Sequence, residues 1–534
     1  MKEAIFYPAE DDNKACSGLI AGNQTTSDGS VICCYTCDGP CDFRVHVVPA
    51  EDHANGSLFR INYAGIPGGM EHTVRADIPE VAHTYRYFSA EVPFGNEKQV
   101  FLSENTCSSI PELSDMTEDA ALLDWHTLAE LTLRRASTAS EAVNIMGALV
   151  EKYGLHGRAE SYLLADPNDQ WIIEIVGNST IWVAVRIPAN AALFHANRLR
   201  IGEIRTDDPE RFRFSPKLFS HAEEKNIWHR DSGIPFHFAK LYANDNEPGS
   251  VRREWRAFSM LCPSVVWKND ASDLPLYVIP EIRITPRWVM QTLFRDVMEG
   301  TEYSLTEGPL AGPFGCPIRQ KVEGFKPAIV NRPIGTWNTV YASVCEARAE
   351  YPDELGGIAW FSIDAPRSGT YVPFWCGTEK LPKEWNSGSY LEYTDDSAFW
   401  AFQAIDTLSA VRYRDMHADV RKVFDEFEEK ELNDQPAIEQ KALELYKSYG
   451  SKAASKFLTV CTSKYCQDAL QIAKDLFRTL LCKYRDGNPE GRINEYWADA
   501  YQKEGWVRIP SVPTDNQPDG PAIDSSDNPP VFDS

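Results

Sequence analysis

The sequence predicts an α+β fold in which stacked β-sheets are covered by helices. Tyr162–Gly177 and Trp182–Ile187 have the apolar runs of strands that are buried on both faces. Two helices precede these strands, and the long segment Phe399–Tyr484 is mostly helical. Because a strand buried on both faces needs a packed layer on each side, we expect the sheets to stack and the helices to cover them.

The first elements are two short strands, Leu19–Ala21 and Val31–Tyr35. The pair Asp28-Gly29 between them favours the positive φ angles of a tight hairpin turn. This arrangement puts Cys16 at the start of the first strand.

Two helices and a strand hairpin come next. The first helix covers about residues 120–135. Thr138-Ala-Ser-Glu141 is a capping box that starts the second helix, and Gly154 ends the apolar stripe of that helix. We expect the two helices to form one outer layer. The hairpin Tyr162–Gly177 follows them and turns at a Pro-Asn pair.

The C-terminal part is predicted to be a helical region without a motif that carries chemistry. Pro436 is typical of a helix start, and Gly450 is typical of a helix end. We expect this region to pack on the core or to form a subunit contact in a homo-oligomer. Residues 511–534 contain five prolines, several aspartates and few apolar side chains, which predicts disorder.

Composition excludes several classes of function. The formal charge of −25, from 53 basic and 78 acidic residues, argues against nucleic acid or an anionic membrane as a partner. The first 15 residues lack the apolar stretch of about 7–15 residues that a secretory signal needs. The 13 cysteines are an odd number without regular spacing, which favours free thiols in a reducing compartment. A cytoplasmic enzyme is therefore expected.

Cys16 is the candidate nucleophile. If the chain is cut between Ala15 and Cys16, one residue carries both a thiol and a free α-amine. The amine has a pKa of about 8 and can act as the base that takes the thiol proton. This is the chemistry of N-terminal cysteine and threonine hydrolases. A cysteine at a strand start is also commonly a small buried apolar residue, so the pattern alone leaves both readings open.

Several segments together carry a resemblance to a known family. They are Cys16-Ser-Gly-Leu-Ile-Ala-Gly, Asp28-Gly29-Ser30, Tyr35-Thr-Cys-Asp38, Gly95-Asn-Glu-Lys-Gln-Val, His195-Ala-Asn-Arg, Gly312-Pro-Phe-Gly-Cys-Pro and Asp396-Ser-Ala-Phe-Trp. In these segments the chain resembles the dipeptidase A family of N-terminal nucleophile cysteine peptidases, to which the secernins are related. The resemblance extends over about residues 16–510.

The resemblance implies a domain organisation. Residues 1–15 would be a propeptide that the chain removes itself, and residues 16–395 a four-layer αββα N-terminal nucleophile hydrolase sandwich. Residues 396–510 would be the mainly helical C-terminal region, and residues 511–534 the disordered tail. The resemblance implies no metal and no other cofactor.

The resemblance also implies three residues around the nucleophile. Asp38 matches an acidic residue that hydrogen-bonds the amine, and Asn197 matches an asparagine whose amide faces the developing oxyanion. Tyr35 stands where many relatives have an arginine, and it is a candidate substrate-binding residue. From the residues alone, Asp38 also reads as a turn aspartate, and an asparagine such as Asn197 near a strand end is usually a turn former.

Three further positions are predicted to bind substrate. Related hydrolases place a second oxyanion-side group near Asn105, which otherwise reads as a polar residue at a strand end. Arg253 and Arg256 belong to an arginine-rich segment, in which one guanidinium could bind the substrate carboxylate through two hydrogen bonds. A solvated helix face is the alternative for this segment.

Other cysteines attract attention but are interpreted as structural. Cys34 and Cys37 form a C-x-x-C pair, which has the spacing of one half of a structural zinc site. No second pair of this kind follows. Strand alternation also sends Cys33 and Cys34 to opposite faces. Cys316 is interpreted as a structural thiol and not as a second nucleophile, because it would not become a chain terminus.

The sequence thus predicts a dipeptidase that hydrolyses short peptides through a self-exposed N-terminal cysteine and a thioester. Two alternatives stay open. One is another amide hydrolase, or an acyltransferase, on the same fold. The other is a non-catalytic binding protein like some secernin-type relatives.

Overall fold

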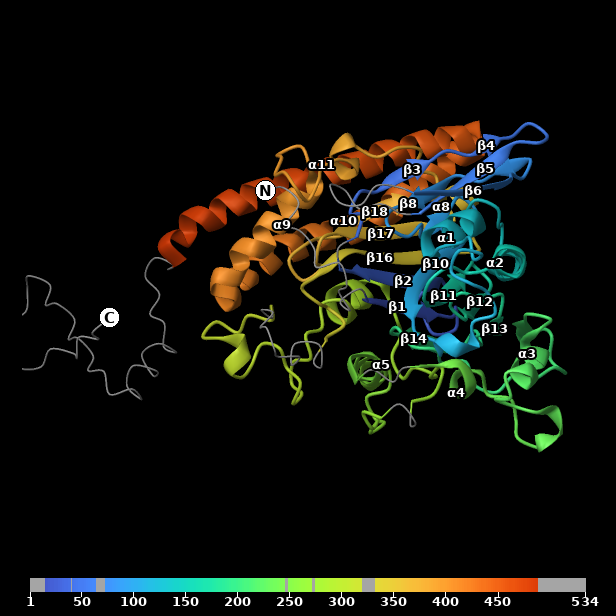
Figure 1. Ribbon diagram of the computed structural model, residues 1–534. Coiled ribbons are helices and arrows are strands. Elements are labelled where there is room, and N and C mark those ends of the chain that lie inside the picture. The colour runs from blue at the N-terminus through green and yellow to red at the C-terminus, as the bar shows by residue number, and fades with distance from the viewer. Residues whose placement is uncertain are drawn as a thin grey trace, which may run out of the picture.

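The computed structural model describes residues 15–39, 41–63, 73–244, 248–270, 274–318 and 332–487. Most of the predicted propeptide and all of the predicted C-terminal tail lie outside these residues. Within them the fold is built on two large antiparallel sheets and two groups of helices (Figure 1). The predicted α+β class is confirmed.

The first large sheet carries the candidate nucleophile. Its six strands are antiparallel, and β1 lies between β2 and β14. In sheet order the strands are β14 (Ala192–His195), β1 (Ala15–Ala21), β2 (Val31–Asp38), β16 (Thr339–Ala347), β17 (Ile358–Ile363) and β18 (Val372–Trp375).

The second large sheet has eight strands, and β10 and β11 of this sheet pack on β1. In sheet order they are β15 (Phe212–Phe214), β13 (Trp182–Arg186), β12 (Gln170–Ile175), β11 (Ala159–Ala165), β10 (Phe101–Cys107), β9 (Gly95–Asn96), β8 (Tyr87–Ser89) and β3 (His46–Val48). Two small ribbons pair β4 (Glu51–Asp52) with β7 (His83–Thr84), and β5 (Leu58–Tyr63) with β6 (Thr73–Pro79).

Helices cover the outer face of each sheet. On the second sheet, α1 (Trp125–Leu133) and α2 (Ala139–Tyr153) pack on β10 and β12. On the first sheet lie α9 (Ala398–Ser409), α10 (Tyr413–Tyr449) and α11 (Ser451–Lys483), drawn in orange and red in Figure 1. The shorter helices are α3 (Leu218–Glu224), α4 (Phe238–Tyr242), α5 (Pro248–Leu261), α6 (Pro286–Trp288) and α8 (Asp353–Gly356).

The two sheets lie close together next to Cys16. A Cβ atom placed on Gly18 would lie 2.4 Å from Ser103 Oγ and 2.9 Å from Leu163 Cδ1. Both distances are shorter than an ordinary Cβ contact, so any larger residue at position 18 would force these two side chains to move. The strand that carries the nucleophile therefore lies directly against the second sheet.

The second helix starts and ends as the sequence predicts. Thr138 Oγ1 accepts a hydrogen bond from the Glu141 amide at 3.1 Å, and the Glu141 side chain accepts one from the Ser137 amide at 2.8 Å. Gly154 ends the helix with a φ of 70°. The first helix is shorter than predicted, because the Asp124 side chain caps it just before Trp125.

Two predictions about turns and breaks are wrong. The connection between β1 and β2 spans residues 22–30, so it is a loop and not a two-residue turn; Gly29 does have a positive φ of 83°. Pro436 lies inside α10 and does not start a helix. A proline in a helix interior costs about 3 kcal/mol. Here Phe427 before it and Ala442 after it are both buried in the core, which holds the two halves in line.

Candidate active site

The backbone of Cys16 is held from two sides. Its amide nitrogen donates to Asn197 Oδ1 at 2.9 Å, and its carbonyl oxygen accepts from Arg253 Nη1 at 2.7 Å. The second guanidinium nitrogen, Arg253 Nη2, donates to the same Asn197 Oδ1 at 2.9 Å. These three residues form a closed set of hydrogen bonds, so the position of the nucleophile's backbone is fixed.

Sheet pairing explains why these residues meet. Gly18 of β1 is opposite His195 of β14, so Asn197, two residues further on, reaches the start of β1. Arg253 comes from α5, and its side chain is 1% exposed. Burial, followed by the charge of Arg332, lowers the pKa of Arg253 to about 10, which leaves the guanidinium charged at neutral pH.

The Asn197 side chain has a different set of contacts from the predicted one. Its oxygen faces the Cys16 nitrogen, and its Nδ2 donates to the Thr106 carbonyl at 2.9 Å. Asn197 therefore contacts the Cys16 nitrogen, the position that the resemblance implies for Asp38.

Asp38 lies at the same end of β1 but has other partners. It is opposite Ala15 in the β1–β2 ladder. Its carboxylate accepts from Arg332 Nη2 at 2.8 Å and from Thr339 Oγ1 at 2.6 Å. Asp38 is thus a buried, charge-compensated residue beside the Ala15–Cys16 bond.

The Cys16 thiol faces Tyr35 and an acidic side chain that the sequence reading missed. Cys16 Sγ lies 3.1 Å from the Tyr35 hydroxyl and 3.6 Å from Glu104 Oε2. The Tyr35 hydroxyl donates to the same Glu104 oxygen at 3.0 Å. Tyr35 is opposite Gly18, so it lies on the same face of the sheet as Cys16. The Cys16 thiol, the Tyr35 hydroxyl and the Glu104 carboxylate thus form a hydrogen-bonded path along which a proton can move from sulfur to carboxylate.

Glu104 has a second carboxyl group as a neighbour. Thr106 is opposite Glu160 in the β10–β11 ladder, and Thr106 Oγ1 donates to Glu104 Oε1 at 2.9 Å. Burial, and then the charge and hydrogen bonding of Glu104, raise the pKa of Glu160 well above its usual value. Within the described part of the chain, Glu160 Oε2 is buried without a hydrogen-bond partner.

The environment of Cys16 disfavours the thiolate. Burial raises the thiol pKa, and the charges of Glu104 and Asp38 raise it further, against hydrogen bonds from Cys37 and Tyr35 that lower it. Cys16 is only 6% exposed in this chain, which is still joined to Ala15. A nucleophile in this position needs a base beside it.

Asn105 does not face the nucleophile, so the geometry does not support its predicted role on the oxyanion side. Its Oδ1 lies 2.8 Å from Nδ1 of the buried His195, whereas the side chain of the preceding residue, Glu104, reaches the thiol. Successive strand residues point to opposite faces, so an error of one residue exchanges the two environments. His195 is fully buried.

Arg256 points away from the nucleophile. It forms an ion pair with Asp296 at 2.6 Å and donates to the Glu299 carbonyl at 3.1 Å. This geometry gives Arg256 a structural role and does not support substrate binding. Nor is the arginine-rich segment a solvated face, because Arg252 and Arg253 are buried.

A metal centre has no support among the described residues. They contain no group of three or more His, Cys, Asp and Glu side chains that could hold an ion. Each of the 13 cysteines, which include Cys34, Cys37 and Cys316, lies in the described part of the chain and forms no disulfide bond there. The same residues form no helix of the length and apolar character that crossing a bilayer requires.

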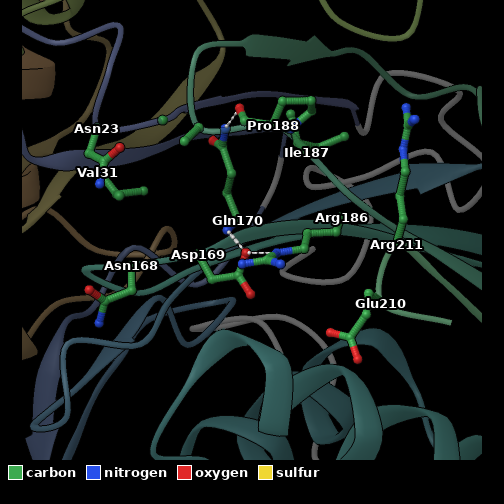
Figure 2. A pocket seen from close by; sticks show the side chains of 12 residues that line it. Asn23, Val31, Asn168, Asp169, Gln170, Arg186, Ile187, Pro188, Glu210 and Arg211 are labelled. Carbon is green, nitrogen blue, oxygen red and sulfur yellow. Dashed lines mark hydrogen bonds and ion pairs between the residues drawn. The ribbon is translucent and has the colours of Figure 1, made fainter. Parts of the chain in front are cut away.

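A cavity of about 390 Å³ lies at the opposite end of β1 (Figure 2). Gly22, which lines it, follows the end of the strand, about 20 Å from Cys16 at the usual strand rise. Some of its polar groups bind one another: Arg186 pairs with Asp169 at 2.6 Å, and Gln170 Nε2 donates to the Pro188 carbonyl at 2.8 Å. The cavity is therefore distinct from the site of the nucleophile.

Comparison with known proteins identifies the class. The sequence profile of peptidase family C69 matches residues 15–426, so the chain belongs to this family of hydrolases. The chain is similar to a probable dipeptidase of Salmonella dublin, with 24% identity over 380 residues that cover 68% of this chain and 81% of that protein. It is also similar to a probable dipeptidase of Latilactobacillus sakei (23% over 414 residues, 73% and 80%) and to probable dipeptidase B of Streptococcus pyogenes serotype M1 (23% over 417 residues, 74% and 78%).

Proposed function

We propose that the protein is a dipeptidase of the N-terminal nucleophile type, with Cys16 as nucleophile after removal of residues 1–15. The observation that carries the proposal is the set of contacts around one residue: the nitrogen, the carbonyl and the sulfur of Cys16 each have a dedicated partner. A buried structural cysteine has no need of this arrangement. The family match also begins at residue 15.

The mature enzyme would use its own α-amine as the base. Asn197 Oδ1 accepts from this nitrogen at 2.9 Å before cleavage and would direct the amine afterwards. The amine takes the thiol proton, and the thiolate attacks the peptide carbonyl. The amine then returns the proton to the leaving nitrogen, and water hydrolyses the thioester.

One hydrogen-bond donor and one buried positive charge near Cys16 would stabilise the oxyanion; Arg253 has no hydrogen left to donate, since Gly249, Cys16, Ser17, Asn197 and Ser250 accept all five. The Asn197 side-chain nitrogen uses one of its two hydrogens on Thr106, which leaves the other for the substrate oxygen. The Arg253 guanidinium supplies positive charge next to Cys16. Removing one such donor from a hydrolase costs about 10²–10³ in rate. The sandwich of two sheets between helices would be the N-terminal nucleophile hydrolase fold.

The substrate class is proposed from the relatives, all three of which are named as probable dipeptidases. Short peptides without a blocked end are the expected substrates. A panel of dipeptides assayed beside N-acyl amino acids separates peptide hydrolysis from other amide chemistry on the same fold.

The test compares wild type with Cys16→Ala. Intact mass spectrometry should find wild type without residues 1–15, whereas the variant keeps them and hydrolyses no dipeptide. Cys316→Ala is the matched control and should be cut and active. A fully active Cys16→Ala chain would end the proposal.

The low exposure of Cys16, 6%, favours one other candidate: a non-catalytic binding protein in which the thiol stays closed. Its signature is a purified wild-type chain that keeps residues 1–15 and hydrolyses none of the dipeptides.

A further inference from the structure

Self-cleavage of the chain poses a problem that the turnover mechanism does not solve. The α-amine that serves as base in the mature enzyme is an amide nitrogen until the Ala15–Cys16 bond is cut. An amide nitrogen does not take up a proton, and here it donates its hydrogen to Asn197. The first cut therefore needs a different base.

Glu104 is in the right position to be that base. Its Oε2 lies 3.6 Å from Cys16 Sγ, and the Tyr35 hydroxyl joins the two at 3.1 Å from the sulfur and 3.0 Å from the carboxylate. These contacts belong to the uncut chain, since β1 continues through Ala15. Glu104 is 2% exposed, so bulk water does not compete for the proton.

We propose that Glu104 is the general base of self-cleavage and that the α-amine replaces it as the base of peptide hydrolysis. This inference rests on the proposed function. It divides proton transfer between two groups, one present before the cut and one created by it.

The step balances without a further reactant except water. The Sγ proton moves to Glu104 Oε2, directly or through the Tyr35 hydroxyl, and the thiolate attacks the Ala15 carbonyl carbon. The carbon–sulfur bond forms and the carbon–nitrogen bond breaks while the Cys16 nitrogen takes the proton from Glu104. Water then hydrolyses the thioester, which restores the thiol and leaves a carboxyl group on Ala15.

The neighbouring carboxyl group favours this role. Two buried carboxylates side by side cannot both be ionised without a large penalty, so one of them holds a proton. Glu160 has the buried oxygen without a partner and the environment that favours its neutral form. Glu104 accepts three hydrogen bonds, from Tyr35, Cys16 and Thr106, as an ionised acceptor does.

The experiment measures self-cleavage and dipeptide hydrolysis separately, because each reaction is proposed to use a different base. The full chain with Glu104→Gln is synthesised in a cell-free system, and intact mass spectrometry follows the fraction that loses residues 1–15. We expect cleavage to be at least 100-fold slower than in wild type, within the 10²–10⁴ range of general-base catalysis. A second form of the variant begins Met-Cys16, so that removal of the methionine supplies the amine; its kcat for dipeptides should fall less than tenfold.

The controls keep each result interpretable. Glu346→Gln removes another buried glutamate, which accepts from Trp360 Nε1 at 2.7 Å in the first sheet, and should be cut at the wild-type rate. Activity of the Met-Cys16 form shows that the Glu104 variant folds. The inference is overturned if the Glu104→Gln chain is cut as fast as wild type, or if its Met-Cys16 form loses turnover as fully as self-cleavage. A wild-type chain that is never cut would instead refute the proposed function.

Discussion

The two sides of Cys16 differ in how they keep polar groups buried. On the backbone side, Arg253 and Arg332 are the cations, and Asp38 and the Cys16 carbonyl are their acceptors. On the thiol side, Glu104 and Glu160 are two acids next to each other. A buried charge with an opposite partner fixes geometry, whereas a pair of like groups is kept buried by sharing a proton. The first side therefore fixes the backbone of Cys16, and the second side is suited to take the proton of its thiol in the proposed mechanism.

The largest effect is expected on the positioning side, from Arg332→Met. The Asp38 carboxylate would lose its guanidinium partner while 1% exposed, and breaking a buried ion pair costs about 3–5 kcal/mol. The free energy of unfolding in urea measures the loss. Adding Asp38→Asn should recover most of it, because the unpaired charge is then gone. If the double variant is no more stable than Arg332→Met, charge compensation is not what this side provides.

Arg253→Met should reduce activity more selectively. The Cys16 carbonyl and the Asn197 side-chain oxygen would each lose a buried donor, so the nucleophile shifts; misplacement by about 1 Å can cost about 100-fold in rate. The kcat for dipeptides and the cleavage rate should both fall. Arg256→Met is the matched control on the same helix and should change turnover little, since that residue pairs with Asp296. Equal losses in the two variants would contradict the assignment.

The thiol side should respond to pH through Glu160. A glutamate whose folded pKa is raised binds its proton more tightly in the folded state. Its contribution to stability is complete below the unfolded pKa of about 4.3 and is lost as pH rises toward the raised folded value. Glutamine does not titrate, so the Glu160→Gln variant lacks this pH-dependent loss. Its free energy of unfolding should therefore rise relative to that of wild type as pH is raised from about 4 to 8. Thermal unfolding at several pH values tests this, and a difference independent of pH would contradict it.

The smallest effect is expected far from both sides. Cys316→Ser should leave kcat and self-cleavage within about twofold of wild type, as ordinary substitutions away from a site do. Cys316 is partly exposed and forms no disulfide bond, so a thiol reagent that inactivates wild type but spares this variant would identify it as a second reactive centre.

Sequence reasoning located much of this site but not its chemistry in full. Cys16, Asp38, Asn197 and Arg253 were predicted from motifs, and the structure brings all four to one end of β1. Their individual contacts depend on strand register, which exchanges a residue's environment with every shift of one position. Asn105, which was predicted to lie on the oxyanion side, instead contacts His195, and the neighbouring Glu104, for which no role was predicted, contacts the thiol.

The remaining partners join distant parts of the chain. Arg332 binds Asp38 across 294 positions, and no local pattern indicates such a pair. The sheets and helices were easier to predict, because apolar periodicity and caps are local signals. Pro436 shows the limit of these signals: a local helix breaker is tolerated where the tertiary packing on both sides of it is strong enough.

Gly18 couples the reactivity of the Cys16 thiol to the distance between the two sheets. The sulfur belongs to one sheet and the Glu104 carboxylate to the other, and the missing side chain at Gly18 sets how closely these layers approach. A single methyl group added at Gly18 would press on Ser103 and Leu163 of the second sheet and so lengthen the path of the proton, although the chain would keep every reacting side chain. The rate of self-cleavage would then depend on the separation of the two sheets. It would fall when the core expands slightly, well before the chain unfolds.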